Sequence, residues 1–131
     1  MENGSRKIVI VDDDRALRDR LQQVLEKAGY TVAQAPSGLR LLSLLEVDRP
    51  DLVLLDVAMS WIDGFELCRA LKANRSYRAI PVVFISGRSA DHDVQTGLGC
   101  GAAGYFIKPL DTQALLERVN ELLTAPIAAT H

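Results

Sequence analysis

Residues 52–56 read LVLLD, a run of four apolar residues that ends in a carboxylate. A strand that is apolar at every position is typical of a parallel sheet covered on both faces, because both sets of alternating side chains are then buried. Pro50 precedes this run, and Asp63-Gly64 follows it as a turn signal. The sequence therefore predicts a central, fully buried strand over 52–56, with Asp56 at its carboxyl end.

Four further short runs are rich in β-branched or aromatic residues, and they predict strands at 7–11, 30–35, 82–86 and 105–107. Between the strands the apolar residues recur at helical spacing, and the expected helices cover about 15–28, 37–46, 65–71, 91–98 and 111–123. Five strands that alternate with five helices predict an α/β domain with a parallel sheet. We expect it to occupy 7–123, with a disordered N-terminus over 1–6 and a flexible tail over 124–131.

The composition excludes several classes of protein. The 131 residues carry a formal net charge of −2, which gives no bulk attraction for nucleic acid or for an anionic membrane. No apolar stretch approaches the roughly 20 residues that a membrane-spanning helix needs. Cys68 and Cys100 are too few for a disulfide framework or a zinc site. We therefore expect a cytoplasmic protein that binds neither membranes nor, by this chain, nucleic acid.

Polar and ionisable residues stand at the carboxyl ends of four predicted strands. The four sets are Asp12-Asp13-Asp14, Asp56, Ser86 and Lys108. Ligands of open parallel sheets bind at this edge. Crowded carboxylates repel one another unless a cation such as Mg²⁺ neutralises them. A carboxylate beside Mg²⁺ and a lysine can attack a phosphoryl group and hold the product, so the pattern favours phosphoryl transfer.

These residues, in this order, resemble the receiver domain of bacterial two-component response regulators, the CheY-like family. The resemblance covers about 7–123. It includes VDDD at 11–14, PDLVLLDVAM at 50–59, DG at 63–64, PVVFISG at 81–87 and GAAGYFIKPL at 101–110. It implies a flavodoxin-like, doubly wound sheet of five parallel strands in the order 2-1-3-4-5.

The resemblance also implies roles for the acidic residues and their neighbours. Asp56 would be the phosphoacceptor. Asp12, Asp13, Asp56 and the backbone carbonyl of Ala58 would hold Mg²⁺. Lys108 and Ser86 would contact the phosphoryl group, and Gly87 would leave room for the donor.

Signalling follows from the same resemblance. Tyr105 matches an aromatic residue whose rotation, together with Ser86, reports phosphorylation to the surface made by the fourth helix, fifth strand and fifth helix. The implied phosphodonor is a histidine kinase or a histidine phosphotransfer protein in a phosphorelay. The output domain or protein is unidentified, and a phosphorylation-linked dimer is possible within the family. Such a switch catalyses its own phosphorylation and dephosphorylation, and it is not otherwise an enzyme.

The loop after Asp56 departs from the family pattern. Ser60 stands where proline is usual, and it is followed by Trp61, for which loop packing is favoured over docking. Ala58 is smaller than the residues often found there, so we expect the phosphoryl group to be more open to water. For Asp14 in the acidic run, capping of the following helix is the favoured role.

Two other functions compete with the switch. A pseudo-receiver would bind a partner without being phosphorylated, although a pure interaction module has no need of an acidic cleft. A phosphatase with an aspartyl nucleophile would need an acid two residues after Asp56, where this chain has Ala58. The G-x-G-x-x-G pattern at 99–104 leads into a strand rather than opening a helix, so it does not predict dinucleotide binding.

Overall fold

The computed structural model describes residues 5–59 and 61–124. Its strands are β1 (Lys7–Val11), β2 (Thr31–Ala35), β3 (Leu52–Asp56), β4 (Val82–Ser86) and β5 (Gly104–Ile107). Its helices are α1 (Arg15–Lys27), α2 (Gly38–Val47), α3 (Gly64–Ala73), α4 (Asp91–Gly99) and α5 (Thr112–Thr124). Strands and helices alternate along the chain as the sequence predicts.

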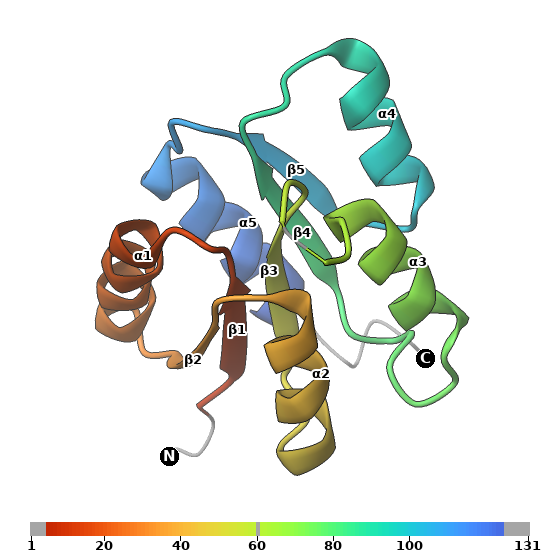
Figure 1. The fold of residues 1–131 in the computed structure, drawn as a ribbon. Coiled ribbons are helices and arrows are strands. Elements are labelled where there is room, and N and C mark those ends of the chain that lie inside the picture. The colour runs from red at the N-terminus through yellow and green to blue at the C-terminus, as the bar shows by residue number, and fades with distance from the viewer. Residues whose placement is uncertain (1–4, 60, 125–131) are drawn as a thin grey trace, which may run out of the picture.

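The five strands form one parallel sheet in the order β2-β1-β3-β4-β5 (Figure 1). This order confirms the expected doubly wound topology. All five residues of β3 are buried, as they are in β4, whereas the edge strands β2 and β5 are only partly covered. The continuous apolar run at 52–56 is therefore the centre of the sheet.

Two apolar layers hold the helices against the sheet. Helices α1 and α5 cover one face, and α2, α3 and α4 cover the other (Figure 1). Alternate residues of each strand enter opposite layers, as Ile10 and Leu54 do on the α1 and α5 side and Val9 and Leu55 do on the other. Each layer is continuous, so both surfaces of the central strands are removed from water.

Local capping explains where several elements begin and end. Asp14 accepts a hydrogen bond from the amide of Leu17 at 3.2 Å, which confirms its predicted role as the cap of α1. Tyr30 was expected to open β2, but its amide still donates to the Leu25 carbonyl at the end of α1, so the strand begins one residue later. Asp63 caps α3 rather than forming a separate turn.

The terminal predictions fall mostly outside the described residues, which exclude 1–4 and 125–131. Of the residues that are described there, Arg6 accepts a backbone hydrogen bond from Thr31, and Thr124 is the last residue of α5. The G-x-G-x-x-G segment runs from the end of α4 into β5, as expected. No helix of the described chain has the length and apolar character of a membrane span.

Gly64 allows α3 to begin directly against the end of β3. A Cβ atom at this position would lie 2.2 Å from the carbonyl oxygen of Asp56 and 2.8 Å from the Cα of Val57. Both neighbours are backbone atoms, so they cannot move aside as a flexible side chain would. The absence of a side chain at residue 64 therefore allows α3 to begin this close to the backbone of Asp56.

We predict that Gly64→Ala lowers the free energy of unfolding by at least about 2 kcal/mol, because the added methyl group must displace backbone. Urea titration followed by circular dichroism measures this change. Gly99→Ala is the matched control, because a Cβ there would meet no atom of the described part of the chain within 4 Å. That control should gain roughly 0.5–1 kcal/mol from a lower entropy of the unfolded chain. Equal stability of the two variants would contradict the close approach at residue 64.

Candidate functional site

The strand register brings the predicted site residues to one edge of the sheet. Val11 pairs with Leu55, so Asp12 and Asp56 lie side by side just beyond these partners on β1 and β3. Ser86 ends the next strand, β4, and pairs with Ile107. The residue after Ile107 is Lys108, whose amide donates to the Ser86 carbonyl.

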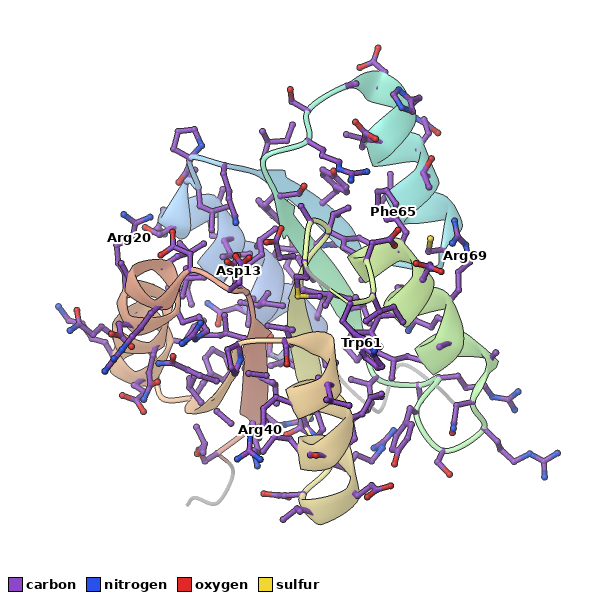
Figure 2. The ribbon with its side chains drawn as sticks, in the orientation of Figure 1. Asp13, Arg20, Arg40, Trp61, Phe65 and Arg69 are labelled. Carbon is purple, nitrogen blue, oxygen red and sulfur yellow. The ribbon has the colours of Figure 1, made fainter. Side chains whose placement is uncertain are left out.

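Three carboxylates converge at this edge. Asp12, Asp13 and Asp56 each place one carboxylate oxygen within 4.8 Å of the oxygens of the other two residues. Asp12 is fully buried and Asp56 is 3% exposed, whereas Asp13 faces solvent from the loop between β1 and α1 (Figure 2). The cluster is thus open to solvent on the side of Asp13 and closed on the side of the sheet.

Lys108 joins two of these carboxylates. Its Nζ lies 2.7 Å from Oδ2 of Asp12 and 3.5 Å from Oδ2 of Asp56. Burial lowers the pKa of Lys108, but the hydrogen bond to Asp12 and the charges of Asp56 and Asp12 outweigh it and raise the pKa above its ordinary value. The lysine is therefore a fixed positive charge at the centre of the cluster.

Asp56 is the carboxylate of the cluster whose ionised form is disfavoured by its surroundings. Burial and the neighbouring charge of Asp12 raise its pKa to about 6, although Lys108 acts in the opposite direction. Among residues 5–59 and 61–124, the only backbone group that donates to its carboxylate is the amide of Ala58, which lies 3.4 Å from Oδ1. One ammonium group does not balance three carboxylates, so the ionised site attracts further positive charge.

The donor set suits a hard divalent cation such as Mg²⁺, which prefers carboxylate oxygens and keeps several water molecules. The exposed side chain of Asp13 leaves a path for a hydrated ion. Residue 58, whose carbonyl is an expected ligand, is itself exposed in the loop after β3. Asp12, Asp13 and Asp56 are therefore the residues that would hold such an ion.

Ser86 and Tyr105 are linked through the backbone of Arg88. The Oγ of Ser86, which is fully buried, accepts a hydrogen bond from the Arg88 amide at 3.0 Å. The hydroxyl of Tyr105 donates to the Arg88 carbonyl at 2.8 Å. The Tyr105 ring packs on Phe84, and a Cβ at Gly97 of α4 would lie 2.8 Å from that ring. The structure thus brings the two predicted switch residues onto one short connection.

Two features of the site differ from expectation or were missed. Trp61 was expected to pack within its loop, but the residue is 66% exposed, and its backbone has a φ of 80° (Figure 2). Arg18 was not singled out, yet its Nη1 donates to the backbone carbonyl of Asp12 at 2.7 Å. A basic residue on the buried face of α1, next to Leu17 and Leu21, was the signal that could have revealed it.

Comparisons with known proteins agree with this geometry. The family described as the response regulator receiver domain matches residues 8–120. The response regulator MprA of Mycobacterium ulcerans is 39% identical over 119 residues, covering 91% of this chain and 50% of that protein. The transcriptional regulatory protein AfsQ1 of Streptomyces coelicolor is 38% identical over 88% of this chain and 50% of its own length.

Solved structures agree as well. A putative response regulator from Chloroflexus aurantiacus has a TM-score of 0.87 at 31% identity, covering 92% of this chain and 98% of that one. The chemotaxis protein CheY4 of Vibrio cholerae has a TM-score of 0.83 at 28% identity, covering 91% and 99%. The chain spans about half the length of the curated relatives that it matches. On its sequence, its fold and its acidic edge, the chain belongs to the family of response-regulator receiver domains of two-component systems.

Proposed function

We propose that Asp56 is the phosphoacceptor of an Mg²⁺-dependent phosphorelay switch. The observation that carries the proposal is the position of the Lys108 ammonium group between the buried carboxylates of Asp12 and Asp56, beside the exposed Asp13. This arrangement leaves Asp56 ionisable yet poorly solvated, with neighbours that can compensate the charge of an incoming phosphoryl group.

The phosphodonor that fits this family is a phosphohistidine on a histidine kinase or a histidine phosphotransfer protein. An oxygen of Asp56 forms a bond to phosphorus while the phosphorus–nitrogen bond of the donor breaks. The electron pair of that bond returns to the imidazole nitrogen, and the product is an acyl phosphate. Mg²⁺, when bound, supplies positive charge that offsets the charge of the phosphoryl oxygens.

The residues around Asp56 then hold the product. Lys108 is within 3.5 Å of the Asp56 carboxylate, so its ammonium group can pair with a phosphoryl oxygen. The Ser86 hydroxyl already accepts a hydrogen bond, so its own hydrogen is free to be donated to the phosphoryl group. Because the Arg88 amide donates to Ser86 and the Arg88 carbonyl accepts from Tyr105, a shift of Ser86 would move the acceptor of the Tyr105 hydroxyl.

The signal would leave through the surface of α4, β5 and α5, where Tyr105 lies. A domain in the other half of a longer regulator, a separate protein or a second copy of this chain could read it. We place the switch in the cytoplasm, where the kinases of such systems present their phosphohistidine.

Phosphorylation tests the acceptor directly. With Mg²⁺ and acetyl phosphate, intact mass spectrometry should show one added phosphoryl group, and Asp56→Asn should abolish it because the nucleophilic oxygen is lost. Asp63→Asn is the control, because Asp63 only caps α3 and asparagine caps equally well. Equal labelling of Asp56→Asn would show that another residue accepts the phosphoryl group. Mg²⁺ binding without any labelling would favour the pseudo-receiver.

The small, exposed side chain at residue 58 should shorten the lifetime of the acyl phosphate. We expect Ala58→Asn to slow dephosphorylation several-fold, because a larger side chain beside Asp56 restricts the approach of water. Loss of the phosphorylated mass after removal of acetyl phosphate measures the rate. An unchanged rate in Ala58→Asn would remove this explanation.

The raised pKa of Asp56 predicts a pH-dependent stability in the absence of metal. Its folded value of about 6 lies above the ordinary value of 3.8, so folding favours the protonated carboxyl. That stabilisation is fully present below about pH 4 and is lost as the pH rises through about 6.

Asp56→Asn keeps a neutral side chain at every pH. Its free energy of unfolding should therefore exceed that of the wild type by about 1 kcal/mol near pH 4.5 and by on the order of 3 kcal/mol at pH 7.5. Urea titrations in EDTA at both pH values measure the difference. Addition of Mg²⁺ at pH 7.5 should stabilise only the wild type strongly. A difference that is independent of pH would contradict the raised pKa.

A further inference from the structure

Arg18 is a buried cation of α1 that the phosphotransfer chemistry does not use directly. The residue is 9% exposed, so its guanidinium is largely removed from water. Its Nη1 donates to the backbone carbonyl of Asp12 at 2.7 Å, and its Nε donates to Oε1 of Gln34 at 2.8 Å. Both partners are neutral oxygens. A buried charge that is held only by neutral groups is costly, unless opposite charge lies nearby to compensate it.

The side chain of Gln34 fixes the orientation of the Arg18 guanidinium. Gln34, on β2, donates its own amide hydrogens to Asp19 at 3.0 Å and to Gln22 at 2.6 Å. The side-chain amide oxygen of Gln34, Oε1, is thereby turned toward Arg18. This network joins β2 to α1, and it aims the planar guanidinium at the end of β1.

Asp12 is held at every polar atom that it has. Its amide donates to the Ala35 carbonyl, and its carbonyl accepts from Arg18. Its Oδ1 accepts from the Asp14 amide at 2.9 Å, and its Oδ2 accepts from Lys108. Of these four contacts, the one from Arg18 is the only one that ties the backbone of Asp12 to a helix side chain.

We propose that Arg18 is a positioning residue for the cation site. Its hydrogen bond to the Asp12 carbonyl fixes the position of the backbone that carries the Asp12 and Asp13 side chains. The inference rests on the proposed function, since it concerns the same acidic cluster. A cation site needs its oxygens at closely defined positions, and partners that orient the ligands commonly change metal affinity 10–100-fold when they are removed.

The sign of the effect separates positioning from simple electrostatics. Arg18→Met removes a positive charge that is hydrogen-bonded to the backbone of Asp12, one of the three clustered acids, and on charge alone this should tighten Mg²⁺ binding. Positioning predicts the opposite: the Mg²⁺ dissociation constant rises at least about 10-fold because the acidic loop loses its anchor. Methionine keeps much of the apolar stem of arginine, so the packing of α1 is largely preserved.

Isothermal titration of metal-free protein with Mg²⁺ gives the dissociation constants, and thermal melts in EDTA confirm that each variant is folded. Arg15→Met is the control, because it also removes a positive charge near the acidic loop, but from a side chain that is 85% exposed and contacts Asp19 rather than Asp12. Its Mg²⁺ affinity should equal or slightly exceed that of the wild type. If Arg18→Met fails to fold, Arg18→Lys decides the question, because it keeps the charge but loses the guanidinium fork; it too should bind Mg²⁺ more weakly.

The outcomes separate the two proposals. Wild-type protein that binds Mg²⁺ together with an Arg18→Met variant that binds equally well or more tightly would overturn the role of Arg18 alone. A lower melting temperature of that variant with unchanged Mg²⁺ affinity would assign Arg18 a purely structural role and overturn it as well. Wild-type protein that binds no Mg²⁺ would overturn the proposed function and this inference together.

Discussion

The structure depends on one electrostatic compromise, in which a single ammonium group lies between two buried carboxylates. The Nζ of Lys108 contacts Asp12 closely and Asp56 more loosely. This inequality leaves Asp12 as a fully bonded anion and Asp56 as an anion short of partners. The same cluster would be costly in a protein with no use for it, because buried carboxylates without matching positive charge destabilise the folded state.

The parallel sheet brings together residues that are far apart in the sequence. Asp12 and Lys108 are 96 residues apart in sequence, yet both follow directly on strands of the same sheet. Each crossover helix returns the chain to the opposite edge, so every strand ends on the same side. The apolar strand interiors fix the register, because a slip of one residue would move buried side chains into the wrong layer. The two apolar layers therefore fix the relative positions of the strand ends that carry the site residues.

Much of this arrangement could be predicted from the sequence, because it depends on local patterns. The apolar run at 52–56 and the charged residues that follow the strands are visible without coordinates, and parallel topology places all of these residues at the same edge of the sheet. The cap at Asp14 follows from residue type and position. The strand order itself required the resemblance to a family, since alternating strands and helices are compatible with several orders.

Other features depend on contacts between distant segments, and no local pattern reveals them. Gly64 was part of a turn signal in the sequence, but its importance lies in its distance to the backbone of Asp56. Arg18 reads as one more basic residue of an amphipathic helix until Gln34 and the Asp12 carbonyl are seen beside it. Trp61 is exposed and has a positive φ, which is uncommon for a bulky residue and which propensity alone does not suggest.

That exposed indole has a practical consequence. Trp61 is the only tryptophan of the chain and stands five residues after Asp56. With 66% of the residue in contact with solvent, its emission should be sensitive to the polarity of its surroundings, and a rearrangement of the loop after β3 should therefore change the fluorescence. The protein thus contains an intrinsic fluorophore in the segment that follows Asp56, and movements of that segment should be observable on unlabelled material.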